Sequence, residues 1–248
     1  MKAILTYHSV DESGSVISMD EQTFRRHVRW LASGYVRVLP LDELAEAPAD
    51  VDAVALTFDD GLESFERIAA PMLREHALPA TLFVVTDAVG TTNVWRGRPD
   101  AGIPVFDLIG WDGLARLAAQ GVSIGAHTCS HPNLALSEGG VVEREIVASK
   151  TRLARELGVE ATTFAYPYGG MSDVARDIVA REFQYGVTTR LAALSPHDDP
   201  ATLPRLDSYY FRAPGTLEAW GTARFRVRMG FLAGARSVRR SLARSATT

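Results

Sequence analysis

Six short apolar segments alternate with longer amphipathic stretches through most of this chain. Short apolar runs bounded by turn residues are typical of strands, and several of the intervening stretches begin at a capping residue or end before a glycine, as helices do. Strands that alternate with helices indicate an α/β fold around a parallel sheet. We predict strands at residues 2–7, 53–58, 80–85, 122–126, 162–165 and 185–188, and helices at 20–33, 63–75, 111–120, 137–157 and 172–182.

The 248 residues suit a single domain, because α/β barrels of this length often fold undivided. No repeat or linker divides the chain, and the irregular stretch 90–110, which carries Trp95, is predicted to be a loop insertion over one face. The single cysteine, Cys129, excludes a disulfide framework, so any metal must be held by His, Asp or Glu. We predict one barrel domain over residues 1–218 and an arginine-rich tail over residues 219–248.

Charge is distributed unevenly along the chain. All 30 acidic residues lie at or before Glu218, whereas the tail carries seven arginines and no acid. An acidic body argues against nucleic-acid binding. The basic tail, with Phe225, Phe231 and Leu232, suits peripheral contact with an anionic membrane, and a solvated, frayed terminus is an equally good interpretation.

The sequence also bears on location. No apolar run is long enough to cross a membrane, and the apolar run that follows Met1 is shorter than a secretory leader requires. We therefore predict a cytoplasmic protein, placed at the inner membrane surface if the tail makes the contact described above. A chain shortened at its N-terminus would look the same.

Polar side chains follow four of the predicted strands at the point where each strand ends. Asp59 and Asp60 come directly after one strand, His127 directly after another, and His8 directly after the first; Tyr168 lies just beyond a fourth. The carboxyl ends of parallel strands share one face of a barrel, where catalytic groups collect. We therefore expect these side chains to converge.

The residue types at these strand ends suit a metal site. Adjacent carboxylates repel, so Asp59 and Asp60 need a cation, a shared proton or solvent, although an Asp-Asp-Gly turn by itself is usually only a turn. His127 and His131 are four residues apart and meet on one face if the segment makes a helical turn. Two imidazoles and one carboxylate make a catalytic metal site with open positions. Cys129 is interpreted as a small buried residue rather than a ligand.

A further turn, Tyr-Pro-Tyr-Gly-Gly, follows the strand predicted at residues 162–165. Such a turn can direct a backbone N–H into a cleft, and its rings can line a sugar pocket. We take Tyr166, Tyr168 and Trp95 as candidate substrate-binding residues. The turn alone is also compatible with an ordinary loop between a strand and a helix.

The motifs TFDDG, HTxxH and PYG, in this order, resemble those of the polysaccharide deacetylase family, which has the NodB-homology domain and is also called carbohydrate esterase family 4. His8 with its two neighbours, and the pair Gly34 and Tyr35, are similar to the poly-N-acetylglucosamine deacetylase branch. The resemblance implies a distorted (β/α) barrel that removes the acetyl group from an N-acetylated sugar. It also implies one divalent ion, zinc before cobalt, nickel or iron, held by Asp60, His127 and His131.

The resemblance further implies that Asp59 is the general base and that the Tyr168 N–H faces the oxyanion. Two positions depart from the family pattern. Ala165 stands where many relatives have an arginine, and we predict that Arg205 orients Asp59 instead. The usual late histidine motif is unclear, so we predict His8 as the general acid ahead of His197.

The sequence leaves the carrier of the sugar open: a polysaccharide, a lipid-linked sugar or a nucleotide-linked sugar. Two other functions also remain. The same residues could hydrolyse a formamide or a small cyclic amide, because the sequence does not show the shape of the pocket. A barrel that only binds carbohydrate is the alternative without catalysis, and the complete set of Asp59, Asp60, His127 and His131 argues against it.

Overall fold

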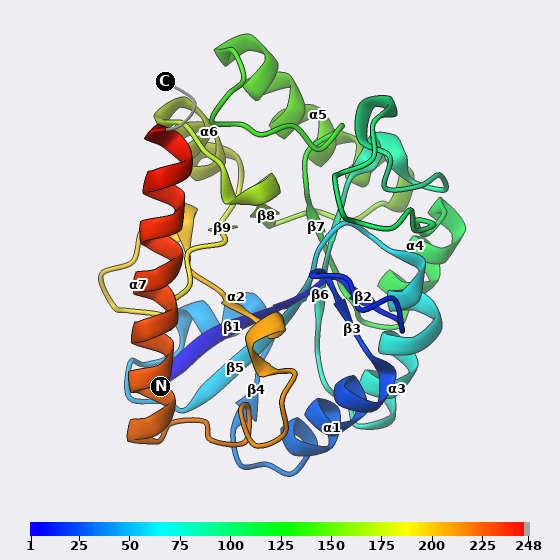
Figure 1. The fold of residues 1–248 in the computed structure, drawn as a ribbon. Helices are drawn as coiled ribbons and strands as arrows, with labels where there is room; N and C mark the ends of the chain where they lie inside the picture. The colour runs from blue at the N-terminus through cyan, green and yellow to red at the C-terminus, as the bar shows by residue number, and fades with distance from the viewer. Residues whose placement is uncertain (246–248) are drawn as a thin grey trace.

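A curled parallel sheet forms the centre of the computed structural model, which describes the backbone of residues 1–245 and the side chains through residue 236. The strand order is β10-β1-β5-β6-β7-β8-β9, with β4 added beside β5. Helices surround the sheet (Figure 1), giving the distorted (β/α) barrel that the sequence predicted. The strands are β1 (Lys2–Tyr7), β4 (Arg37–Val38), β5 (Ala53–Phe58), β6 (Thr81–Val84), β7 (Ser123–Ala126), β8 (Thr163–Ala165), β9 (Tyr185–Val187) and β10 (Leu206–Asp207).

All six predicted strands are present. Strands β1 and β5 have the predicted bounds, and the other four are one or two residues shorter. Strands β4 and β10 were not predicted, nor was the separate parallel pair formed by β2 (Ser9–Val10) and β3 (Ser18–Met19). Each of these strands has only two residues, which is too short to show an alternation of apolar and polar side chains.

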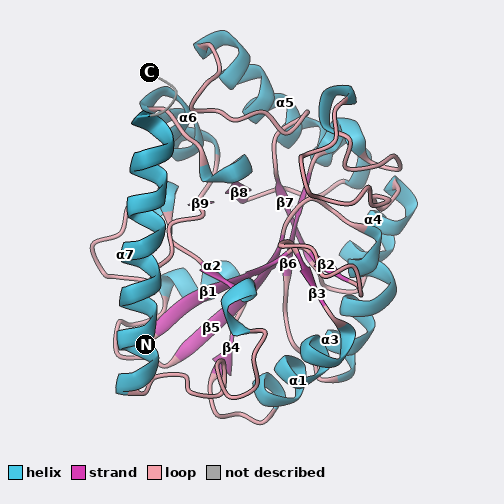
Figure 2. Cartoon of the chain, viewed as in Figure 1, coloured by secondary structure: helices cyan, strands magenta, loops and turns pink. Residues whose placement is uncertain are grey.

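Helices follow most of the strands and cover the outside of the sheet (Figure 2). Two predicted caps are present: Asp20 accepts a hydrogen bond from the Thr23 N–H at 2.8 Å, and Ser172 accepts one from the Ala175 N–H at 3.3 Å. The helices are α1 (Glu21–Ala32), α2 (Leu41–Glu46), α3 (Ala70–Glu75), α4 (Trp111–Ala119), α5 (Gly139–Leu157) and α6 (Asp173–Glu182). Helix α2 was not predicted, and a π-helical turn at Phe65–Ala69 precedes α3.

A buried histidine ties α1 to the barrel. The His27 Nε2–H donates to the Phe211 carbonyl at 3.0 Å, so Nδ1 accepts a hydrogen bond from the Tyr7 hydroxyl, also at 3.0 Å. Burial lowers the pKa of His27 to about 4. The ring is therefore neutral at neutral pH and its role is structural.

The basic tail forms a helix, α7 (Ala223–Ser245), that lies along one side of the barrel (Figure 1). Phe225 is buried and stacks on Phe211 with ring centroids 5.7 Å apart, so this residue is not available to a membrane, contrary to the prediction. Leu232 is partly buried against the core, whereas Phe231 is 76% exposed. The side chains of three tail arginines, at positions 239, 240 and 244, lie outside the described residues. No helix in the described part of the chain is long and apolar enough to cross a membrane.

Candidate active site

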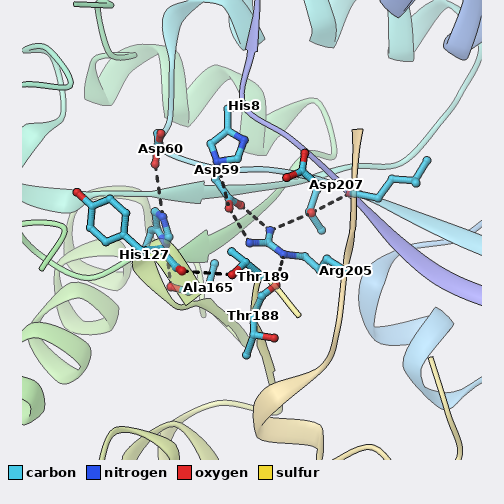
Figure 3. Close-up of polar contacts among 12 residues, drawn as sticks. His8, Asp59, Asp60, His127, Ala165, Thr188, Thr189, Arg205 and Asp207 are labelled. Atoms are coloured by element: carbon cyan, nitrogen blue, oxygen red, sulfur yellow. Dashed lines mark hydrogen bonds and ion pairs between the residues drawn. The ribbon is translucent and has the colours of Figure 1, made fainter. Parts of the chain in front are cut away.

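The predicted strand-end residues meet at one end of the sheet. His8, Asp59, Asp60 and His127 point toward a common centre (Figure 3) because β1, β5 and β7 run parallel and each residue lies just beyond the carboxyl end of its strand. They line a cavity of about 100 Å³ together with Ile17, Asn93, Trp95, Asp100, Ile103, His131, Tyr168 and Thr189.

Three of these residues form a compact group of potential ligands. The Asp60 Oδ1 lies 3.4 Å from the Nε2 atoms of both His127 and His131. One ligand atom from each residue lies within 4.8 Å of the other two, and all three residues are buried. Two imidazole nitrogens and a carboxylate oxygen are a donor set that zinc and related divalent ions accept. The residues present therefore fit a divalent metal.

Hydrogen bonds on the far sides of the two rings fix their tautomers. The His127 Nδ1 lies 2.7 Å from the Ala165 carbonyl, which can only accept, so Nδ1 carries the proton. The Tyr168 hydroxyl donates to Asp100 at 2.9 Å and lies 3.2 Å from the His131 Nδ1, which must then donate to it. Both Nε2 lone pairs consequently face Asp60, which is the arrangement that metal ligation needs.

The charge state of Asp60 agrees with this arrangement. Burial by itself would raise the pKa of Asp60, but the contacts of its carboxylate with the His127 and His131 imidazoles hold it well below its usual range. The carboxyl group is therefore ionised, and it brings a negative charge to a site where a cation can neutralise it.

The backbone around the site is strained. Asp60, Thr128, His131 and Tyr168 have φ values of 74°, 67°, 60° and 57°, in the left-handed region that favours glycine. Such conformations cost about 1–3 kcal/mol each and persist only where the surrounding structure enforces them. Of the six non-glycine residues in this region among those described, these four lie in the three motif loops. The strain is concentrated where the ligands are placed.

Asp59 is held by a buried arginine. The two guanidinium nitrogens of Arg205 contact the two carboxylate oxygens at 2.7 and 2.6 Å, and Arg205 Nε donates to the Thr188 carbonyl at 3.0 Å (Figure 3). Burial would raise the pKa of Asp59, but the charge and hydrogen bonds of Arg205 lower it below its usual value. The contact expected from the sequence is therefore present, and it keeps Asp59 ionised in a fixed orientation.

The two candidate acids lie in different places. His8 lines the cavity, and its Nε2 is 3.8 Å from the Asp59 Oδ2. His197 is exposed in the loop between β9 and β10 and is not among the residues that line the cavity. Of the two histidines, only His8 lines the cavity beside Asp59.

The three aromatic candidates also differ. Tyr168 is 46% exposed at the rim, and the Trp95 ring packs against His131 with ring centroids 4.4 Å apart, so both line the cavity. The prediction for Tyr166 is wrong: its side chain is fully buried, and its hydroxyl donates to the Ala201 carbonyl at 3.0 Å. Tyr166 lies on the same side of the chain as Phe164, with ring centroids 5.1 Å apart, so it packs in the core.

Sequence reasoning missed Asp100. It lies in the irregular stretch 90–110, which lies over the cavity, and its carboxylate accepts the Tyr168 hydroxyl hydrogen bond described above. An acidic residue between Pro99 and Ala101 has no local signal that distinguishes it from a solvated loop residue.

The chain is similar to several known proteins. The family model described as polysaccharide deacetylase matches residues 46–187. A poly-β-1,6-N-acetyl-D-glucosamine N-deacetylase of Staphylococcus aureus is 24% identical over 204 residues, which cover 76% of this chain and 67% of that protein. The Bacillus subtilis protein YxkH is 25% identical over 198 residues, 77% of this chain and 66% of its own length. The chain thus spans about two thirds of these curated relatives.

Two solved structures share the fold. IcaB from Ammonifex degensii superimposes with a TM-score of 0.73 at 24% identity, covering 84% of this chain and 93% of that one. The Streptococcus pyogenes deacetylase PplD, in complex with acetate, gives a TM-score of 0.69 at 24% identity over 83% of this chain and 91% of that one.

Proposed function

The chain belongs to the polysaccharide deacetylase family, and from that premise we propose that it hydrolyses the N-acetyl group of an N-acetylated sugar with the help of one divalent cation. The observation that carries the proposal is the convergence of the Asp60, His127 and His131 ligand atoms beside the ion pair of Asp59 and Arg205. The cation, zinc first by the donor set, would be held by those three ligands and would polarise the acetyl carbonyl and acidify a water molecule.

The other side chains have separate tasks in this proposal. Asp59 accepts the proton of the attacking water, and Arg205 keeps that carboxylate ionised and oriented. The Tyr168 N–H, on the turn after β8, stabilises the oxyanion. His8 returns a proton to the departing amine, because it is the histidine that lines the cavity beside Asp59.

The substrate class is tested by acetate release. We expect acetate from β-1,6-linked N-acetylglucosamine oligomers or from a lipid- or nucleotide-linked N-acetylated sugar, and no comparable formate release from small formamides. A preference for formamides would favour the small-amide function instead. A protein that binds the oligomers, retains no divalent metal after dialysis and releases no acetate would be a carbohydrate-binding barrel.

The choice between the two histidines gives a paired prediction. His8→Ala should lower kcat by about 10²- to 10⁴-fold, the usual contribution of a positioned acid or base. His197→Ala is the matched control and should behave as the wild type, because that side chain is exposed and outside the cavity. Steady-state kinetics on both variants decide the assignment, and a loss confined to His197→Ala would reverse it.

We also propose that α7 contacts an anionic membrane surface. Val227 and Phe231 are 74% and 76% exposed and lie one helical turn apart, with the exposed Arg224 and Arg226 nearby and no acid in the tail. Arginine near an anionic leaflet contributes about 1 kcal/mol per residue. The cytoplasmic location expected from the sequence stays a prediction.

Co-sedimentation with vesicles of anionic lipid tests the contact. Val227→Ser with Phe231→Ser should release the protein into the supernatant, whereas removing the whole tail would also expose core that Phe225 covers. A wild-type protein that does not sediment at low ionic strength would show that α7 only packs on the barrel.

A further inference from the structure

The loop that carries both histidines, residues 127–131, is held from two sides. On one side its carbonyl groups accept backbone hydrogen bonds from the segment after β6: Thr86 N–H donates to the Thr128 carbonyl at 3.2 Å, and Asp87 N–H donates to the Cys129 carbonyl at 2.9 Å. These contacts leave the N–H groups of the same loop to be satisfied elsewhere.

Glu145 of α5 satisfies them on the other side. Its Oε2 accepts hydrogen bonds from the N–H groups of Cys129 and Ser130 at 2.9 and 2.8 Å, and its Oε1 accepts one from the Ser130 hydroxyl at 2.7 Å. Among the described residues, every side-chain hydrogen bond of Glu145 goes to this loop. A carboxylate that accepts backbone N–H groups makes stronger hydrogen bonds than a neutral acceptor.

The held loop has a conformation that it would not adopt freely. Thr128 and His131, at either end of the segment that Glu145 holds, have φ values of 67° and 60°. Left-handed backbone at non-glycine residues persists only where surrounding contacts enforce it. Glu145 accepts its hydrogen bonds from Cys129 and Ser130, the two residues between Thr128 and His131. These hydrogen bonds therefore hold the segment that sets the relative positions of His127 and His131.

We propose that Glu145 is a positioning residue for the metal site: its carboxylate holds the histidine loop in the geometry that brings both Nε2 atoms to Asp60. Glu145 is not among the residues that line the substrate cavity, so it acts through the loop and not on the substrate. The inference rests on the proposed function only in requiring that the three-residue site binds a divalent cation.

The affinity of the protein for Zn²⁺, measured by titrating metal-free protein against a competing chelator, tests the inference without reference to activity. Glu145→Ala should raise the dissociation constant by about 10- to 100-fold, the range found when groups that orient metal ligands are removed. Glu145→Gln should largely restore the affinity, because its amide oxygen can accept both N–H groups while its NH₂ donates to the Ser130 hydroxyl.

Glu143→Ala is the matched control. Glu143 lies two residues earlier on α5, is exposed and pairs with Arg181 at 3.1 Å on the surface, so its removal should leave the dissociation constant unchanged. In the activity assay, Glu145→Ala should lower kcat more than it alters KM, since the substrate makes no contact with Glu145.

An unchanged dissociation constant in folded Glu145→Ala overturns the inference, and so does a glutamine variant as weak as the alanine variant. If Glu145→Ala does not fold, Ser130→Ala removes the donor to Oε1 and should raise the dissociation constant by a smaller factor; wild-type affinity there also overturns the inference. A wild-type protein that binds Zn²⁺ tightly but releases no acetate from any N-acetylated sugar would overturn the proposed function and leave this inference standing.

Discussion

Alanine at Asp60, His127 or His131 is expected to remove the bound cation and to abolish acetate release while the barrel stays folded. Each variant leaves two ligands where a catalytic site needs three, and the remaining ligand atoms cannot hold the ion in place. Metal content of the purified variants, measured alongside acetate release and the thermal melting curve, checks all three parts of this expectation.

The wild-type protein provides the control for this series. Exhaustive chelation should abolish its activity, and adding back zinc should restore it. Full turnover by chelated wild-type protein would show that Asp60, His127 and His131 do not form a catalytic metal site. An alanine variant that lost activity only because it unfolded would be recognised by its melting curve.

Asp59→Asn is expected to retain the metal and yet lose about 10²- to 10⁴-fold in kcat, because an amide cannot accept the proton of the attacking water. It should also destabilise the protein. Arg205 is fully buried and its charge would lose its partner, and breaking a buried ion pair from one side costs about 3–5 kcal/mol.

A second variant separates these two effects. Asp59→Asn combined with Arg205→Met removes the unpaired charge, so most of the lost free energy of unfolding should return while kcat stays low. Denaturant unfolding curves and steady-state kinetics on both variants make the measurement. Wild-type activity in metal-loaded Asp59→Asn would remove Asp59 from the mechanism.

The sequence predicts most of the sheet and the convergence of the candidate metal ligands for the same reason. Strands β5 and β7 are mostly apolar runs, Asp60 is the second residue after β5 and His127 is the first after β7, so parallel packing brings the two side chains together. The contact between Arg205 and Asp59 was reached by a different route, from the arginine that is missing at Ala165.

What the sequence could not predict depends on tertiary packing. Tyr166 and Tyr168 are only two residues apart, yet one is in the core and the other at the rim, because the backbone at Tyr168 turns with a φ of 57°. Asp100 and Glu145 make hydrogen bonds to other segments of the chain, and no local pattern marks either partner. The burial of Phe225 likewise follows from the docking of α7.

The position of Arg205 next to β10 has a consequence for how the protein matures during synthesis. Strand β10 pairs with β1, so that Leu206 lies beside Leu5, and this pairing joins segments from the two ends of the barrel. The three candidate metal ligands are all translated by residue 131, but the counter-charge of Asp59 arrives only when Arg205 has emerged and docked. A nascent chain arrested after Thr188 and before Arg205 would carry the candidate ligands together with Glu145 and Ala165, but Asp59 would be unoriented, so such truncated products are expected to bind metal without hydrolysing the substrate.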